Sequence, residues 1–364
     1  MKNAVISRRI RRIKELLLRW FDWLTNQHYN VYILLALLVL TSCSNSQMVL
    51  PNSSGAAFEL LWVINDDVYN SPAGDSLRLF IEGPVPFLPQ PESQFDISRI
   101  EHRHYDRLLQ TTRNILFVNI DPQRFSQAKL KFKHNLWANN QAVCYLNAPT
   151  QEALAEYVSK NGDCIVQFFV TAERNRMHSY YIENINRTAN DTVSKLFGAN
   201  IAIPTSLNRF KRGNHFLWIS NGSAVNNQNI VLYSVPYTTT AQLTTEAILA
   251  RRDSVMKVNI PGEFEGSFMG TEVRHLYPET RFISHNGQWA AVTRGLWRMQ
   301  NGAAMGGPFV SLTRIDRIHQ CILTVEGFVY APSRSKRNLL RQMDAMVYSL
   351  LTEDDLHKNI DKNN

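Results

Sequence analysis

The pair Asn286 and Gly287 constrains the fold more than any other short segment, because it stands between two apolar stretches, 281–284 and 288–299. A two-residue hairpin turn needs a positive φ at both central positions, and Asn-Gly adopts such a turn readily. Turn residues also separate further strand-like stretches, which are residues 215–220, 229–235, 267–275, 309–315 and 321–330. We therefore predict that the second half of the chain is rich in strands, with 309–315 paired to 321–330.

Helical patterns alternate with strands along the rest of the chain. Strands are expected at 58–65, 114–120 and 141–146, and helices at 75–81, from Thr150 through Tyr157, in a second stretch after Tyr157, at 191–197, at 245–257 and after Ser333. Four prolines between residues 83 and 91 exclude a helix there and favour an extended arm. The predicted fold class is α+β, with antiparallel sheets packed against helices.

Two pairs of similar segments suggest an internal duplication. The apolar stretch 58–64 resembles 215–219, and the triplet Ala-Pro-Thr at 148–150 resembles Ala-Pro-Ser at 331–333, each after a strand and before a helix. Both pairs occur in the same order, so we predict a first α+β unit at 58–190 and a second at 191–351, followed by a charged tail at 352–364. The element order of the second half resembles the PsbP-like sheet-and-helix sandwich, which is an analogy of fold alone.

The N-terminal region carries the pattern of a bacterial lipoprotein signal. Nine apolar residues at 32–40 are followed by Thr41, Ser42 and Cys43. This run is shorter than the ~20 residues that span a bilayer, and it fits the apolar region of a signal peptide. We predict a signal peptide at 1–42 with a long basic region, lipidation of Cys43 by acyl chains such as palmitate, and a tether at 43–57. The alternative is a buried core helix that ends in a cysteine.

Charge and cysteine content narrow the class of protein. Residues 1–42 carry seven Lys and Arg against two Asp and Glu, so their removal lowers the formal net charge from +8 to +3, which argues against nucleic-acid binding. No acidic residue directly follows Cys43, which favours the outer membrane, with the protein facing the periplasm. The expected contacts are the membrane, through the lipid, and an envelope protein partner. Cys144 and Cys164 could pair, but buried, unpaired cysteines are favoured.

Few segments suggest chemistry. His102, His104 and Asp106 would share one face of a strand and could hold a metal, although a solvated strand face is the favoured interpretation. The chain lacks a nucleophile elbow, a phosphate loop and a dinucleotide fingerprint, so no cofactor is predicted and no catalytic residue is assigned. Glu326, an acid inside an apolar strand, is expected to be the buried partner of Arg294 or Arg298.

A candidate ligand or partner surface is formed by unusual glycine-rich and aromatic segments near the end of the chain. Glycines at strand ends allow another chain or a ligand to approach the backbone closely, but they also serve bulges and tight turns. The tryptophan and phenylalanine there could equally belong to an ordinary core. The candidate residues are Arg294, Trp297, Met305, Gly306, Gly307 and Phe309.

The chain resembles a family of Bacteroidota lipoproteins known only as a domain of unknown function. The resemblance rests on the motifs LPQPE (88–92), RNI (113–115), IPG (260–262), RGLW (294–297), MGGPF (305–309) and GFVYAP (327–332). It implies a lipid-anchored envelope protein and brings no activity, cofactor or catalytic residue. The long basic presequence is a departure from the family pattern.

These observations favour a lipid-anchored, non-enzymatic binding or scaffolding module in the periplasm. One alternative is a hydrolase or metal-dependent enzyme that acts on cell-wall or glycan material. Another is a carrier of a small ligand.

Overall fold

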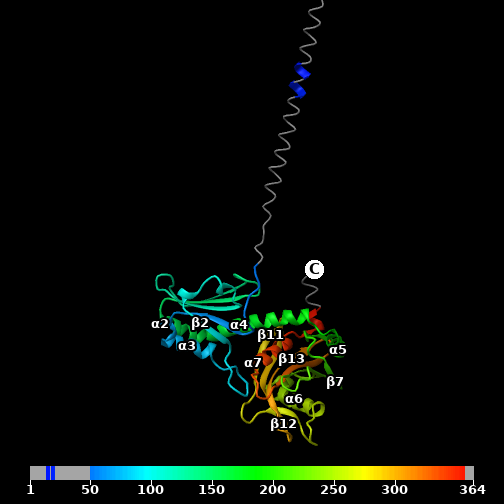
Figure 1. The fold of residues 1–364 in the computed structure, drawn as a ribbon. Helices are drawn as coiled ribbons and strands as arrows, with labels where there is room; N and C mark the ends of the chain where they lie inside the picture. Colours follow the sequence, from blue (N-terminus) through cyan, green and yellow to red (C-terminus); the bar gives the residue numbers. More distant parts are fainter. Residues whose placement is uncertain (1–13, 17, 21–49, 357–364) are drawn as a thin grey trace, which may run out of the picture. The chain divides into compact units, whose positions relative to one another are not determined.

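The computed structural model describes residues 14–16, 18–20 and 50–356. The chain divides into two compact units, Met1–Leu50 and Pro51–Asn364, and the fold described below is that of the second unit (Figure 1). Cys43, the predicted lipidation site, lies outside the described residues, as does almost all of the predicted signal peptide.

The first sheet of this unit has five strands in the order β2-β1-β3-β5-β4. Strands β1, β2, β3 and β5 are parallel to one another. Only the edge strand β4 is antiparallel to its neighbour, β5. The expectation of antiparallel sheets is therefore wrong for this part of the chain. The apolar runs of β1 and β3 are buried on both faces, as in parallel sheets. The strands are β1 (Glu59–Val63), β2 (Asp96–Ile100), β3 (Asn114–Ile120), β4 (Lys129–His134) and β5 (Ala142–Ala148).

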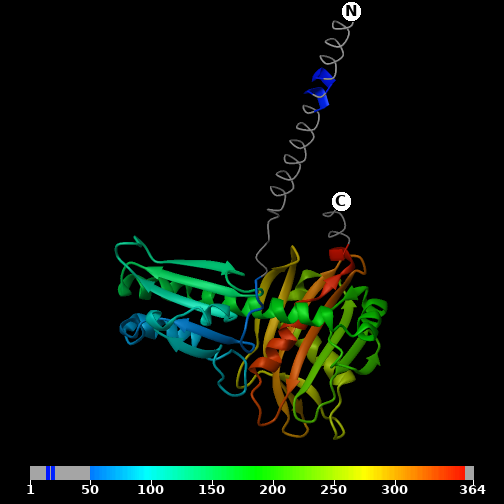
Figure 2. The ribbon, with the colours of Figure 1, turned by 45° about the horizontal axis from the view of Figure 1, so that its top comes forward.

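Helices α2 (Asp66–Tyr69), α3 (Pro72–Ile81) and α4 (Gln151–Glu183) accompany this first sheet. Thr150 caps α4 as predicted, because its side chain accepts a hydrogen bond of 3.3 Å from the Ala153 N–H. The two helical stretches predicted after Thr150 form one continuous helix, which runs on from the first sheet to the second (Figure 2). Gly162 lies within it without ending it: a Cβ there would lie 2.4 Å from the Phe80 ring of α3, so the glycine permits close helix packing.

The second sheet is antiparallel throughout, in the order β10-β12-β13-β14-β9-β8-β7, with β11 paired to β12. The predicted hairpin at Asn286 and Gly287 is confirmed, with φ of 54° and 74° between β11 and β12. The predicted pairing of 309–315 with 321–330 is confirmed as β13 and β14. The strands are β7 (Arg209–Gly213), β8 (Phe216–Ser220), β9 (Asn227–Pro236), β10 (Phe268–Glu272), β11 (Glu279–His285), β12 (Gln288–Gln300), β13 (Gly306–Asp316) and β14 (Cys321–Tyr330).

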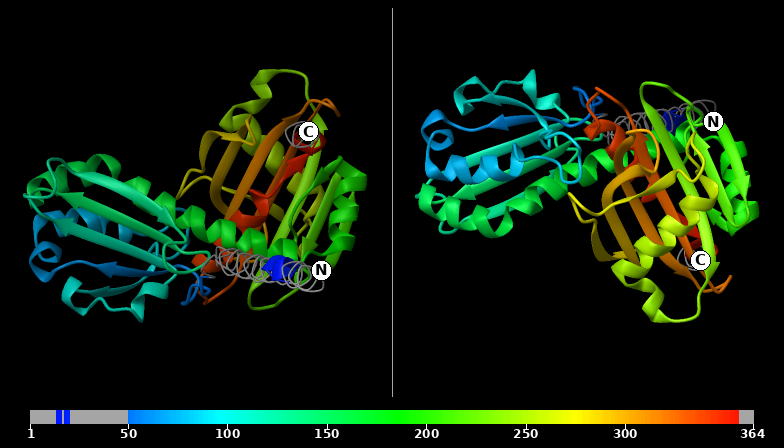
Figure 3. Two further views of the ribbon diagram at one scale, coloured as in Figure 1. Left: turned by 90° about the horizontal axis from the view of Figure 1, so that it is seen from above. Right: turned by 90° about the horizontal axis from the view of Figure 1, so that it is seen from below.

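Helices cover both faces of the second sheet (Figure 3). On one face, α5 (Arg187–Phe197) and α7 (Arg337–Val347) enclose the largest apolar core, and the end of α4 reaches it through Tyr181. On the other face, α6 (Thr245–Asn259) closes a smaller core. The predicted glycine end of α5 is confirmed, since Gly198 has a φ of +59°. The short elements are η1 (His102–His104), η2 (Leu109–Thr111), η3 (Thr240–Leu243), β6 (Ala199–Asn200) and β15 (Leu351–Thr352).

The α+β fold class is confirmed, but the two sheets are not copies of one unit. The first sheet is largely parallel and the second is antiparallel. The two similar triplets also differ in role, because Thr150 caps α4 whereas Ser333 has a φ of +57° in a turn and α7 begins only at Arg337. The similarities reflect turn chemistry, since a residue before proline is held extended whatever the fold around it.

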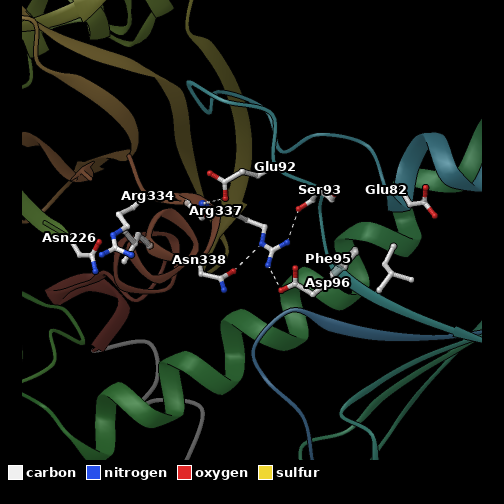
Figure 4. Close-up of a pocket in the computed structure, with 12 residues that line it drawn as sticks. Glu82, Glu92, Ser93, Phe95, Asp96, Asn226, Arg334, Arg337 and Asn338 are labelled. Atoms are coloured by element: carbon white, nitrogen blue, oxygen red, sulfur yellow. Dashed lines mark hydrogen bonds and ion pairs between the residues drawn. The ribbon is translucent and has the colours of Figure 1, made fainter. Parts of the chain in front are cut away.

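The proline-rich arm joins the two halves of the unit. The Glu92 carboxylate accepts hydrogen bonds from the Lys336 and Arg337 N–H groups, at 2.6 and 2.9 Å, at the start of α7. The Arg337 guanidinium in turn donates to the Ser93 carbonyl at 2.9 Å and pairs with Asp96 (Figure 4). An acid at a helix N-terminus satisfies free N–H groups and favours the helix dipole. The LPQPE motif thus supplies the missing cap of α7 from the other half.

Replacing Glu92 by alanine is therefore expected to lower the free energy of unfolding by about 1–2 kcal/mol, as the loss of a helix cap does. The matched control is Glu82→Ala. Glu82 is also partly buried and, with Glu92, lines a cavity of about 750 Å³, but it makes only a weak 3.4 Å contact with the Tyr69 hydroxyl. Urea unfolding of both variants measures the difference. If both variants lost the same free energy of unfolding, the cap that Glu92 provides would not stabilise the protein beyond an ordinary partly buried glutamate.

Candidate functional site

The metal candidates do not form a site. His102 and His104 lie in the 3₁₀ turn η1 and not on a strand, so the predicted shared face is wrong. Backbone hydrogen bonds close the turn, from the His104 N–H to the Glu101 carbonyl at 3.0 Å and from the Tyr105 N–H to the His102 carbonyl at 3.1 Å, and Asp106 lies beyond it. Among the described residues, no group of three or more His, Cys, Asp or Glu side chains could hold a metal ion.

Cys144 and Cys164, whose pairing the sequence allowed but did not favour, are not paired. Cys144 is buried and free on β5, as favoured from the sequence, and Cys164 is free and exposed on α4. Burial raises the pKa of the Cys144 thiol above its usual range, so this sulfur behaves as a small apolar group.

The candidate surface residues are divided between the two faces of the second sheet. Successive side chains of β12 alternate between faces. Arg294 faces α7 and donates two hydrogen bonds to Asp344, at 2.6 and 3.1 Å. Trp297 lies on the opposite face, in the core that α6 covers, together with Phe309. Arg294 therefore lies apart from the aromatic candidates.

The partner of Glu326 is neither Arg294 nor Arg298 but Arg252, on α6. The guanidinium donates to both carboxylate oxygens at 2.8 Å, and both side chains are fully buried. Burial raises the pKa of the Glu326 carboxyl, and the Arg252 charge opposes that rise. The guanidinium also lies over the Phe309 ring, 4.2 Å from its centre. Sequence reasoning missed this pair because 74 residues separate its members.

A small, mainly apolar cavity lies on the α6 side of the sheet. It has a volume of about 250 Å³, and we call it the methionine pocket. It brings together the IPG segment and residues of the RGLW, MGGPF and GFVYAP motifs, which are far apart in the chain. Its lining residues are Trp218, Asn227, Asn229, Ile260, Pro261, Gly262, Glu263, Met269, Trp297, Met299, Ala303, Met305, Phe328 and Tyr330.

Trp297 fixes one wall of the methionine pocket. Its indole N–H donates to the Val329 carbonyl at 3.1 Å, and its ring meets that of Phe328 edge-on, with centres 5.7 Å apart. Gly307 makes this contact possible, because a Cβ at that position would lie 2.0 Å from the same carbonyl oxygen. The glycine of the MGGPF motif therefore serves close backbone approach.

Replacing Gly307 by alanine is expected to lower the free energy of unfolding by about 1–3 kcal/mol, since a methyl group forced against backbone oxygen must displace the strand. The same change should shift the fluorescence of Trp297, whose indole bonds that oxygen. Gly302→Ala is the control, because its Cβ would come no closer than 3.0 Å to any atom, the side-chain Cβ of Ser267. Denaturant unfolding with fluorescence detection measures both effects, and similar curves for the two variants would contradict them.

The methionine pocket has few polar groups. The Trp218 indole donates to Asn229 at 2.9 Å, which satisfies both side chains in part. The Asn227 side-chain oxygen, by contrast, is buried and accepts no hydrogen bond from the described residues. Two apolar side chains next to lining segments of the pocket are exposed to solvent, Val258 at 77% and Phe264 at 57%.

The lining of the methionine pocket is mainly apolar. Glu263 is the only carboxylate among the described lining residues, so the pocket has no acid–base pair. Methionines and aromatic rings adapt to apolar ligands of varied shape, and buried apolar pockets with one or two polar groups are typical ligand sites. The fold and the pocket together define an α+β protein with a small cavity lined mainly by apolar side chains. Within the described part of the chain, no helix combines the length and the apolar character needed to cross a membrane.

Comparison with known families agrees with this description and adds no activity. Residues 186–349 match a family model described as Domain of unknown function (DUF4837). Residues 53–181 match a second model, described as Domain of unknown function (DUF8532). The chain is thus similar to two uncharacterised domain families, and the gap between the two matches, residues 182–185, includes the last two residues of α4. No curated protein matches the chain.

Proposed function

We propose that this protein is a lipid-anchored, non-enzymatic binding module of the cell envelope, held at the periplasmic face of the outer membrane through Cys43. The methionine pocket is its binding site. The observation that carries the proposal is the convergence of the segments 260–262, 294–297, 305–309 and 327–332 on one apolar cavity with no acid–base pair. The N-terminal pattern at 32–43 supports the anchor.

The occupant we propose is a large apolar side chain of an envelope protein. A volume of about 250 Å³ is below the 300–1,000 Å³ of typical drug-sized sites and suits a single anchoring side chain of the kind that dominates protein interfaces. The free Asn227 oxygen offers an acceptor to a backbone or indole N–H of that partner. The exposed Val258 and Phe264 would add apolar contact around it.

Two adjacent alanines provide a matched test. Ala303 lines the methionine pocket, whereas Ala304 does not, and both are exposed. Ala303→Trp should fill the pocket without disturbing the core, and Ala304→Trp should leave it open. The full-length lipoprotein, solubilised from its native membrane at native expression level, is purified with either change and its partners are quantified.

We expect a near-stoichiometric protein to co-purify with the unchanged chain and with Ala304→Trp, and to be lost with Ala303→Trp. The assignment of the pocket would be overturned if the co-purifying protein were lost with both variants or retained with both. It would also be overturned if no protein co-purified with the unchanged chain. Turnover of an envelope substrate by the purified protein, abolished by one side-chain change, would overturn the non-enzymatic part of the proposal.

A further inference from the structure

A second cavity, of about 470 Å³, lies on the opposite face of the second sheet, between the proline-rich arm, α4, β11, β12 and α7. It shares no lining residue with the methionine pocket. Four arginines line it, and we consider three of them together: Arg174 from α4, Arg294 from β12 and Arg341 from α7. These we call the arginine cluster.

The arginine cluster has more positive charge than its neighbours neutralise. Both oxygens of Asp344 are used by Arg294. Arg174 and Arg341 have no carboxylate within 4.0 Å among the described residues. The Arg174 guanidinium instead lies over the Tyr348 ring, 4.0 Å from its centre. The cluster is therefore short of anions.

Other acids on the cavity wall do not correct this imbalance. Asp163 lines the cavity eleven residues before Arg174 on α4, which is ~16 Å along the helix at 1.5 Å per residue. Glu279 is paired with Arg281 at 2.6 Å. The excess positive charge is thus local to the end of the cavity that Arg174 marks.

Arg341 is the member of the cluster with the least compensation. It is 91% buried, since only 9% of its surface is accessible. One guanidinium nitrogen donates to the Gln94 side-chain oxygen at 2.6 Å, and its Nε has no hydrogen-bond partner among the described residues. Burial and the neighbouring arginines lower the pKa of Arg341 to about 10, although Asp344 opposes this. A buried guanidinium without an anion is costly.

The rest of the cavity wall is largely apolar. Val166 and Val170 lie two turns and one turn before Arg174 on the same face of α4. Val85, Phe87 and Ile283 line the cavity as well. The cavity therefore offers guanidinium donors at one end and apolar side chains beyond them.

We propose that this cavity binds an anionic amphiphile, with its phosphate or carboxylate group held by the arginine cluster and its apolar part against Val166 and Val170. A guanidinium fork matches both kinds of acidic group. The anion completes the coordination that Asp344 alone does not supply. This site is separate from the methionine pocket, so the proposal goes beyond the proposed function and its test stands apart from it.

Calorimetric titration of the full-length lipoprotein, in a non-ionic detergent, tests the proposal with three probes. Hexyl phosphate carries both parts of the ligand, inorganic phosphate carries the head alone, and hexanol carries the tail alone. We expect hexyl phosphate to bind at least tenfold more tightly than either fragment. Equal binding of inorganic phosphate would overturn the amphiphile assignment, and equal binding of hexanol would overturn the anion site.

Arg341→Met is the decisive variant, because it removes the charge and keeps most of the volume. We expect it to weaken hexyl phosphate binding at least tenfold and to leave the thermal midpoint of the unliganded protein unchanged or higher. Arg281→Met is the control: Arg281 also lines the cavity, but it is exposed and already paired with Glu279, so binding should change less than threefold.

Arg174→Met provides a second route if Arg341→Met does not fold, and the same loss of binding is expected. The proposal would be overturned if hexyl phosphate bound the measured cluster variant as tightly as the unchanged protein. It would also be overturned if Arg281→Met weakened this binding as much as the cluster variant does.

Discussion

Replacing Glu326 by leucine is expected to lower the free energy of unfolding by about 3 kcal/mol, the lower end of the range for breaking a buried ion pair. The change leaves the Arg252 guanidinium buried at 1% accessibility. The loss falls at the lower end because Asp253 stays within 3.2 Å of Arg252, and the Thr271 hydroxyl within 2.9 Å. Urea unfolding at neutral pH measures it.

A double variant separates the cost of the stranded charge from the loss of packing. Arg252→Met combined with Glu326→Leu removes both charges and keeps similar volumes, so it should be more stable than Glu326→Leu alone. As a surface control, Glu156→Ala breaks the Lys160–Glu156 pair, whose side chains are 67% and 72% exposed, and should change stability by less than ~0.5 kcal/mol. A double variant less stable than the single one would show that Arg252 contributes by more than its charge.

Replacing Cys43 by alanine is expected to remove the protein from the outer-membrane fraction. Each buried methylene of an acyl chain adds ~0.8 kcal/mol of membrane affinity, and stable anchoring takes more than one chain. Without the thiol no lipid can be attached there, and cleavage before residue 43 should not occur. Density-gradient fractionation with intact-mass analysis measures the location, the lipid and the new N-terminus together.

Cys164→Ala is the matched control for the anchor, because Cys164 is a free cysteine that is exposed on α4. It should keep both the outer-membrane location and the lipid mass. If Cys43→Ala behaves in the same way, the protein reaches its membrane by another route and the lipoprotein assignment fails.

Local signals in the sequence were enough to predict the strands of the second sheet other than β7. Asn286 and Gly287 define their hairpin because the two-residue turn requires a positive φ, which those residues adopt readily. The end of α5 at Gly198 follows from the same freedom. Each of these features is decided within a few residues of chain, so no distant contact can change it.

Strand direction in the first sheet could not be predicted in this way. The runs of β1 and β3 are apolar at almost every position, and such a run pairs equally well in either direction. Direction is set by the connections between the strands, since β1 leads to β2 through α2 and α3, and β3 leads to β5 through the edge strand β4. The long helix was also read as two pieces, because the packing of Gly162 against Phe80 cannot be inferred from spacing alone.

The candidate site was predicted only in part, for a related reason. The sequence singled out Trp297 and Met305, which do line the methionine pocket, because glycine and aromatic residues stand out locally. Strand alternation places Arg294 and Trp297 on opposite faces, but only the packing of α7 and α6 shows what each face meets. The partners of Arg294 and Glu326 come from α7 and α6. Contacts between distant segments carry no local signal.

The most direct test of the binding role is site-specific photocrosslinking in living cells. A photoreactive amino acid is placed at Ala303 in the full-length protein, with Ala304 as the neighbouring control. We expect a crosslink to one envelope protein from position 303 and little or none from position 304. The same crosslinks from both positions, or none from position 303, would contradict the role of the methionine pocket as a binding site.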